Sequence, residues 1–269
     1  YLTRHLYAAY APWGIGQVRE SLPYDDRCLE FRDHQWNEKA IRQRFRQELI
    51  RFDPDWVIVT DSWSSKVLLA EAAAGYRTLI RIAAQECLCP LNNVRLLVDA
   101  QGSPQQCPLH QLQNAADCRH CVARHGSQLS GPLHQAEREL IGFGTPEYDR
   151  RLRQMFANAA GVMAINPMIA DEFRPFARQV HVVPSGFDAQ RFENLPPLPP
   201  LKDRNLRFLF AGLLPEFMKG FHVLKAAGER LWQLRQDFEV WATGEPEGTE
   251  PPWLKCVGWQ SQEDLPALI

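Results

Sequence analysis

The chain has 269 residues and a formal net charge of −2, with 45% hydrophobic and 23% charged residues, as in ordinary globular proteins. The balanced charge excludes a global basic field, so we expect no nucleic-acid partner. No apolar run approaches the ~20 residues of a membrane span and no signal-peptide pattern opens the chain, which favours a cytoplasmic location. At about 150 residues per domain, the length predicts two domains, or one domain and part of another.

Strand-like and helix-like patterns alternate through residues 1–193, which predicts a parallel α/β domain. The expected helices span residues 36–51, 61–74 and 168–176, and the expected strands span 56–60, 78–83, 159–165 and 181–183. Ligands of such domains bind beyond the carboxyl ends of the strands. The residues at those ends are therefore candidates for a binding cleft: Asp61, Glu86, Asn166, Ser185 and Gly186.

Each of these candidates also has a purely structural interpretation. Asp61 and Asn166 stand where helix N-caps are expected. Ser185-Gly186 also suits a plain turn, and Glu86 also suits a surface loop.

Five of the seven cysteines lie between Cys87 and Cys121, in a stretch that we expect to be a polar loop. Cys118 and Cys121 have the Cys-x-x-Cys spacing that lets two thiolates chelate one ion. Together with Cys89 and Cys107 they could form a tetrahedral structural zinc site, with His110 or His120 as substitute ligands. Reduced thiols or disulfides explain the same cysteines, and the spacing does not decide between the three.

A proline-rich segment, residues 194–204, predicts the domain boundary. Four prolines between Pro196 and Pro200 exclude both a helix and a central strand. We therefore expect a semi-rigid extended linker between a first domain, residues 1–193, and a second, residues 205–269.

The segment from Leu206 to Gly244 predicts a strand, a loop, a helix and a second strand. The first apolar run breaks at Gly212, and the helical pattern begins after Lys219-Gly220. A helix N-terminus beside a lysine suits a phosphate group, because unpaired N–H groups and a full positive charge meet there. A lysine in a solvated loop is the simpler alternative.

Residues 180–258 resemble the nucleotide-sugar half of a family 4 (group 1) glycosyltransferase of the GT-B fold. Four pieces carry the resemblance in order: residues 181–192, the strand 208–212, Lys219-Gly220, and the segments 238–244 and 257–266. The chain departs from the family at Ser185, where asparagine is usual, and at Leu213, where an arginine often stands. The family's pair of glutamates has no counterpart, and the chain opens at Tyr1, so we expect an interior fragment with an incomplete second domain.

The resemblance implies two Rossmann-like domains with parallel sheets that face a crevice. It implies a retaining transferase that moves a sugar from a nucleotide-diphosphate sugar to an acceptor hydroxyl, without a catalytic metal. The expected donor-binding residues are Gly212, Lys219, Gly220 and Gly244, and the expected acceptor is a glycan or a lipid-linked glycan. Peripheral association with the cytoplasmic face of a membrane would fit such an acceptor. The alternative function is a non-catalytic transferase-like or cysteine-loop interaction module.

Overall fold

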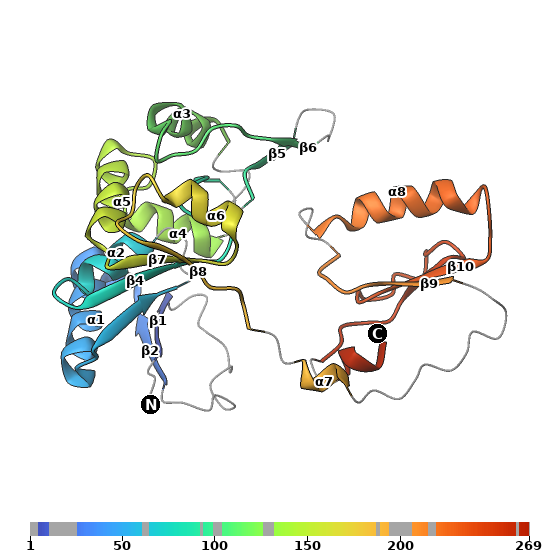
Figure 1. Cartoon of the computed structure of the whole chain (residues 1–269), viewed down its shortest axis with the longest axis horizontal. Coiled ribbons are helices and arrows are strands. Elements are labelled where there is room, and N and C mark those ends of the chain that lie inside the picture. The colour runs from blue at the N-terminus through green and yellow to red at the C-terminus, as the bar shows by residue number, and fades with distance from the viewer. Residues whose placement is uncertain are drawn as a thin grey trace. The chain divides into compact units, whose positions relative to one another are not determined.

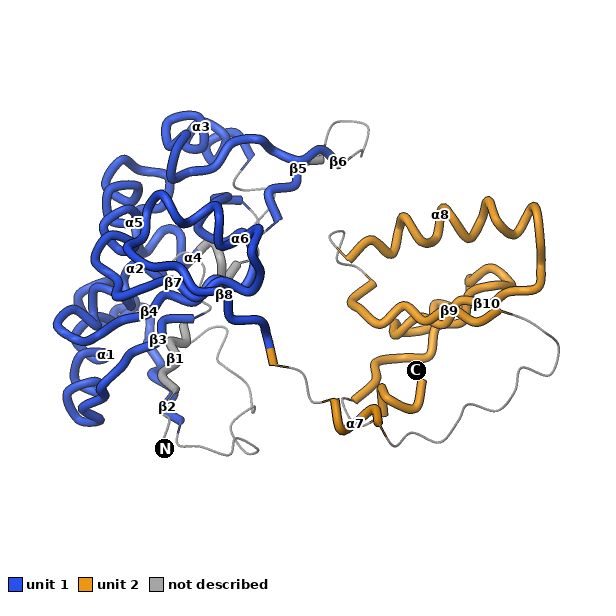
Figure 2. Tube along the Cα trace, in the orientation of Figure 1, with its two compact units in different colours: residues 1–185 blue, residues 186–269 orange. Residues whose placement is uncertain are grey.

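A computed structural model describes residues 5–10, 26–60, 65–91, 94–98, 104–125, 132–186, 189–193, 206–214, 219–261 and 264–268. The chain divides into two compact units, Tyr1–Ser185 and Gly186–Ile269 (Figure 2). The proposed linker, residues 194–204, lies outside the described residues and stays a prediction.

Unit 1 has a four-stranded parallel sheet in the order β3-β4-β7-β8, so the predicted parallel α/β architecture is confirmed (Figure 1). Two strands at the start of the chain form a separate parallel pair, β1-β2. The elements of unit 1 are β1 His5–Tyr10, β2 Asp26–Phe31, the 3-10 turn η3 Asp33–Gln35, α1 Glu38–Phe52, β3 Trp56–Val59, α2 Lys66–Ala72, β4 Arg77–Ile82, β5 Leu96–Val98, β6 Pro104–Gln106, α3 Ala115–His125, α4 Pro132–Leu140, α5 Pro146–Asn158, β7 Gly161–Ala164, α6 Pro167–Phe173 and β8 Val180–Val182.

The core of unit 1 lies between this sheet and its helices. Ile80 and Ile82 of β4 are fully buried, as are Leu68 of α2 and Phe156 of α5. On α5 the buried side chains Tyr148, Leu152, Met155 and Phe156 recur at helical spacing. Burying such a stripe is what holds a helix against a sheet, because isolated helices of this length are marginal in water.

The cysteine-rich stretch is more ordered than the sequence predicts. It contains the antiparallel hairpin β5-β6 and the helix α3, and Cys118 and Cys121 lie on that helix. The expectation of a polar loop is wrong here because α3 has a weak apolar stripe, with Cys118 as its buried residue. A pattern search that counts only larger apolar residues overlooks such a helix.

Unit 2 has a three-stranded parallel sheet in the order β11-β10-β9, with α8 as the crossover between β9 and β10. Its elements are α7 Gln190–Glu193, β9 Leu206–Phe210, α8 Phe221–Trp232, β10 Phe238–Ala242, β11 Leu254–Cys256 and the 3-10 turn η5 Leu265–Leu268. Phe238, Val240 and Trp253 form its core, and Leu224 and Leu231 of α8 pack against them. β11 ends at Cys256, directly before the segment 257–266 that the resemblance includes.

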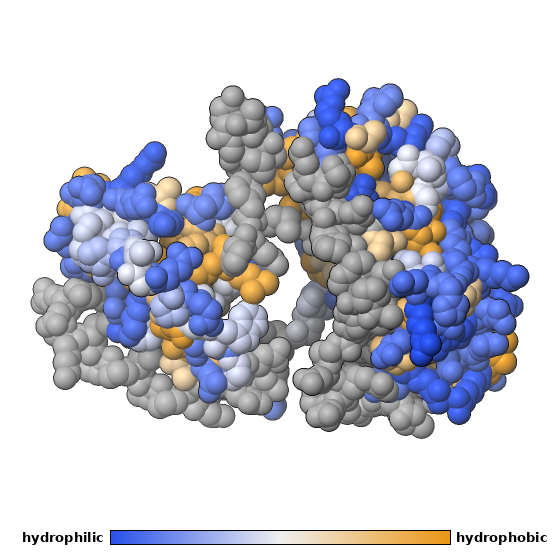
Figure 3. Space-filling model, turned by 180° about the vertical axis from the view of Figure 1, so that it is seen from behind, coloured by the Kyte–Doolittle hydropathy of each residue, from blue (hydrophilic) through white to orange (hydrophobic). Residues whose placement is uncertain are grey.

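Apolar residues also reach the surface of both units (Figure 3). In unit 2, Leu206 and Phe208 of β9 are 45% and 47% exposed. None of the helices in the described ranges has the length and apolar character needed to span a membrane.

Gly228 lets α8 pack closely on Trp253, and we expect Gly228→Ala to destabilise unit 2. A Cβ at this position would lie 2.4 Å from Trp253 Cη2, so the indole would have to move. Overpacking of this kind costs about 1–3 kcal/mol, against a gain of up to ~1 kcal/mol in helix propensity. Denaturant unfolding measures the net loss, and Glu229→Ala at the exposed neighbouring position should show none. If Gly228→Ala is as stable as Glu229→Ala, then the close contact between Gly228 and Trp253 does not limit the side chain at position 228.

Candidate functional site

The carboxyl ends of β9 and β10 are held together by Thr243. The N–H of Gly212 donates to Thr243 Oγ1 at 3.0 Å, and this hydroxyl donates to the carbonyl of Gly212 at 3.3 Å. The N–H of Thr243 also donates to the carbonyl of Phe210 at 3.1 Å. Thr243 is 7% exposed, so these hydrogen bonds are shielded from water. Sequence reasoning missed this residue, although it directly precedes the predicted Gly244.

Lys219 and Gly220 lie at the start of α8. Gly220 is the N-cap residue and has φ +79°, a left-handed conformation that glycine adopts without steric cost. Its carbonyl accepts hydrogen bonds from the N–H groups of Val223 and Leu224 at 3.0 and 3.2 Å. Lys219 is exposed. A Cβ at Gly212 would lie 3.9 Å from Lys219 Cβ, so the structure brings these two predicted residues side by side.

Gly244 lies so close to Leu214 that any side chain there would displace the leucine. A Cβ there would lie 1.9 Å from Leu214 Cδ1, on the loop that leads toward Lys219. All four predicted donor-binding residues therefore lie at one edge of the unit 2 sheet.

This edge also carries an acidic group that sequence reasoning missed. Glu245 Oε1 accepts a hydrogen bond from the N–H of Trp259 at 3.2 Å. The side chain of Trp259 is 69% exposed. Among the residues that the structure describes, the edge therefore combines an exposed lysine, a carboxylate and an exposed aromatic side chain.

In unit 1, Glu86 lies inside the protein rather than in a surface loop. Its carboxylate accepts the N–H groups of Ala83 and Ala84 at 2.7 and 2.6 Å. The Nζ of Lys66 lies 3.6 Å from Glu86 Oε1 and donates to the carbonyl of Arg81 at 2.7 Å. The side chains of Lys66 and Glu86 are 0% and 10% exposed, so this contact is a buried ion pair. Both carboxylate oxygens of Glu86, a predicted cleft residue, are therefore engaged in contacts within unit 1.

The other cleft candidates of unit 1 are placed as follows. Asn166 caps α6, accepting the N–H of Ile169 at 2.8 Å, as its structural interpretation predicts. Ser185 Oγ accepts Arg81 Nη2 at 3.2 Å, and Arg81 Nη1 also reaches the carbonyl of Val183 at 3.4 Å. Gly186 is exposed, and Asp61 lies outside the described residues. Arg81, another residue that the sequence did not single out, thus fixes the chain just before the end of unit 1.

None of the four proposed zinc ligands forms a disulfide in the structure. Cys89 and Cys118 are buried, and Cys107 and Cys121 are half-buried. Across the described ranges, no group of three or more histidine, cysteine or acidic side chains is already arranged to hold a metal ion. His110, predicted as a substitute ligand, packs edge-on against the ring of Phe176. Its Nε2 lies 3.8 Å from Glu172 Oε2.

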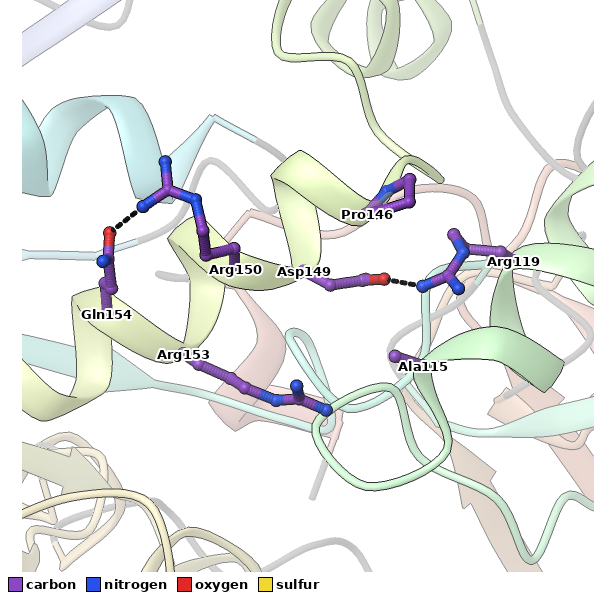
Figure 4. Close-up of a pocket in the computed structure, with 7 residues that line it drawn as sticks. All are labelled: Ala115, Arg119, Pro146, Asp149, Arg150, Arg153 and Gln154. Atoms are coloured by element: carbon purple, nitrogen blue, oxygen red, sulfur yellow. Dashed lines mark hydrogen bonds and ion pairs between the residues drawn. The ribbon is translucent and has the colours of Figure 1, made fainter.

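A pocket of about 340 Å³ opens between α3 and α5 (Figure 4). Three arginines and one aspartate line it, together with Ala115, Pro146 and Gln154. Arg119 pairs with Asp149, Arg150 with Glu147 and Gln154, and Arg153 with the carbonyl of Leu112. Arg119 and Arg150 are paired with carboxylates and Arg153 donates to a neutral carbonyl, so each guanidinium already has a hydrogen-bond partner.

No protein-family model and no curated protein matches the sequence. Several solved structures are similar at low identity. A Listeria monocytogenes protein described as a UDP-N-acetylglucosamine 2-epimerase is 11% identical, with a TM-score of 0.41 over 91% of this chain and 57% of its own. A Staphylococcus aureus MnaA structure with UDP is 8% identical, with a TM-score of 0.43 over 99% of this chain and 71% of its own.

A UDP-GlcNAc 2-epimerase from Methanocaldococcus jannaschii is 8% identical, with a TM-score of 0.40 over 99% of this chain and 76% of its own. The chain therefore spans little more than half the length of the Listeria protein. The α/β class follows from the parallel strand orders of the two units themselves.

Proposed function

We propose that the intact protein is a glycosyltransferase that uses a nucleotide-diphosphate sugar, and that the donor binds at the unit 2 edge formed by Gly212, Lys219, Gly220 and Gly244. One observation carries this proposal. An exposed lysine stands directly before the glycine N-cap of α8, a helix of 12 residues, and beside the end of β9. The order of motifs in residues 180–258, which resembles family 4 glycosyltransferases, supports the same assignment.

The chemistry requires stabilisation of a leaving group. As the glycosidic bond of the donor breaks, negative charge grows on the diphosphate, and fixed positive charge beside it lowers the barrier. Lys219 supplies one full charge, and the first turn of α8 supplies N–H groups and the positive end of the helix dipole. Gly220 lets a phosphate approach the backbone closely, because no Cβ stands in the way. In this proposal the acceptor is a hydroxyl of a glycan or lipid-linked glycan, transfer proceeds with retention, and the protein works in the cytoplasm or at a membrane's cytoplasmic face.

We expect Lys219→Ala in the intact protein to weaken nucleotide-sugar binding by about 1.5–3 kcal/mol, which is about 10- to 150-fold in Kd. With Leu213 where an arginine often stands, Lys219 is the proposed main cation on the diphosphate. Turnover should fall further than affinity, because charge on the diphosphate grows toward the transition state. Calorimetry with uridine, guanosine and adenosine diphosphate sugars measures the affinity.

Lys225→Ala is the matched control, since Lys225 is an exposed lysine further along α8. It should bind the same ligands as tightly as the parent protein. If Lys219→Ala also binds every ligand as tightly as the parent, the donor site is refuted. The non-catalytic transferase-like or interaction module is then the better proposal.

A further inference from the structure

The pocket between α3 and α5 brings two arginines and an aspartate together within unit 1. Arg119 lies on α3, while Asp149 and Arg153 lie four residues apart on α5 and so share one face of that helix. Arg119 and Asp149 point toward each other, and Arg153 extends toward the loop before α3 (Figure 4). The volume of about 340 Å³ is at the lower end of the range for small-molecule sites. The pocket therefore has room for a small ligand.

Both guanidinium groups keep hydrogen-bond donors that a ligand can use. Arg119 Nη1 pairs with Asp149 Oδ2, and Arg153 Nε and Nη2 donate to the carbonyl of Leu112 at 3.2 and 2.9 Å. Within the described ranges, Nε and Nη2 of Arg119 and Nη1 of Arg153 have no hydrogen-bond partner. Arginine presents five N–H donors in a planar fork, which matches the oxygens of a phosphate group. Because both arginines line the pocket, a phosphate group there meets unused donors from two helices.

The charges at the pocket favour an anion. The ion pair between Arg119 and Asp149 is neutral as a whole, and so is the pair between Arg150 and Glu147. Arg153 donates to a neutral carbonyl and forms no ion pair with any residue that the structure describes. The charge of Arg153 is therefore not compensated by a carboxylate, and the pocket as a whole is positive.

Two helix N-termini add to this positive potential. Ala115 is the first residue of α3 and Pro146 the first residue of α5, and both line the pocket. The first turn of a helix carries unpaired N–H groups and the positive end of the helix dipole. Asp117 and Glu147 stand in the same first turns, but both are exposed and lie outside the lining of the pocket.

Asp149 supplies an acceptor beside these donors. Its side chain is 8% exposed, and Arg119 contacts its Oδ2. In the part of the chain that the structure describes, Asp149 Oδ1 has no hydrogen-bond partner. Burial raises the pKa of Asp149, and the hydrogen bond from Arg119 acts in the opposite direction. A ligand hydroxyl that donates to Oδ1 would stabilise this desolvated carboxylate, so the pocket suits a phosphate with a hydroxyl near it.

We propose that the pocket between α3 and α5 binds a small phosphate ester that also carries a hydroxyl group. Arg119 and Arg153 hold the phosphate, and Asp149 accepts the hydroxyl. Binding is reversible and forms no covalent bond. The pocket lies in unit 1, so the proposal does not depend on the donor site in unit 2.

The experiment is calorimetry of the purified chain with three probes: glycerol 3-phosphate, inorganic phosphate and glycerol. We expect glycerol 3-phosphate to bind at millimolar concentration or below, inorganic phosphate to bind more weakly, and glycerol not to bind. Arg153→Gln should weaken glycerol 3-phosphate binding by about 10-fold or more, because it removes a charged donor. Asp149→Asn should reduce the preference for glycerol 3-phosphate over inorganic phosphate, since the charged acceptor of the hydroxyl is lost.

Arg46→Gln is the matched control. Arg46 is an exposed arginine on α1 that also donates to a neutral carbonyl, that of Ala74, and it lies outside the pocket. This variant should bind glycerol 3-phosphate as tightly as the parent chain. Equal weakening by Arg46→Gln and Arg153→Gln would mean that surface charge in general attracts the phosphate, and would overturn the proposal.

The parent chain keeps the test decisive even if a variant fails to fold. A parent chain that binds neither glycerol 3-phosphate nor inorganic phosphate at millimolar concentration overturns the proposal. If the parent chain binds inorganic phosphate as tightly as glycerol 3-phosphate, the pocket recognises a bare anion and the role of Asp149 is refuted. The donor site in unit 2 is tested separately by Lys219→Ala, which should leave glycerol 3-phosphate binding to this pocket unchanged.

Discussion

Glu86→Ala should lower the free energy of unfolding of unit 1 by about 3–5 kcal/mol, the cost of leaving a buried charge without its partner. The Nζ of Lys66 lies 3.6 Å from Glu86 Oε1, and the lysine side chain is 0% exposed. Removing the carboxylate also deprives the N–H groups of Ala83 and Ala84 of their acceptor. Denaturant unfolding, followed by a probe in unit 1, measures the loss.

A double-mutant cycle separates the ion pair from the loop contacts. Lys66→Met in the Glu86→Ala background should recover part of the lost stability, because no unpaired charge then remains buried. Recovery should be incomplete, since the amides of Ala83 and Ala84 still lack an acceptor. The exposed Glu147 is the control carboxylate, and Glu147→Ala should change stability little. If Glu86→Ala is as stable as Glu147→Ala, the ion pair between Lys66 and Glu86 does not contribute to the stability of unit 1.

Arg151→Ala should cost about 3 kcal/mol of unfolding free energy, because Arg151 joins three helices. From α5, its Nη1 reaches Glu38 Oε1 of α1 at 2.7 Å, and its Nε reaches Glu71 Oε1 of α2 at 2.7 Å. Burial opposes the charge of Arg151, but its hydrogen bonds to Glu71 and Glu38 outweigh burial and raise its pKa. Arg42 also contacts both glutamates, which keeps the expected loss below that of a fully orphaned pair.

The adjacent Arg150 offers a matched control on the same helix. Arg150 pairs with Glu147 on the exposed face of α5, where solvent screens the charges. Arg150→Ala should therefore leave the unfolding midpoint nearly unchanged, while Arg151→Ala lowers it clearly. Thermal or denaturant unfolding of the two variants side by side measures the difference. If Arg150→Ala and Arg151→Ala lose the same amount of unfolding free energy, the burial of Arg151 does not determine how much it stabilises unit 1.

Much of the fold could be predicted from the sequence, because local patterns carry it. The run from Phe238 to Ala242 predicts a strand, and β10 has those bounds. Lys219-Gly220 predicts the start of a helix, and α8 begins at Phe221. Asn166 followed by Pro167 predicts an N-cap, which the structure confirms. Helices α3 and α5 were not predicted, although Thr145 before Pro146 is a capping signal for α5 that could have been used.

The candidate sites depended more on tertiary structure. Glu86 follows the end of a strand, so its position in the sequence predicts a place in a cleft. In the structure its side chain is buried beside Lys66, which lies twenty residues earlier in the chain. The role of Thr243 depends on the pairing of β9 with β10, because its partners are Phe210, the last residue of β9, and Gly212 just beyond it. Long-range partners of this kind leave no periodic trace in the sequence.

By itself, then, the sequence determined the α/β class, the main strands of both parallel sheets, half of the helices and the glycine–lysine edge of unit 2, since periodicity, capping and glycine placement are local properties. Only the tertiary structure decided which charges are buried together and which glycines face a close neighbour. Burial and pairing depend on residues far apart in the chain, and a side chain's role changes when folding removes it from water.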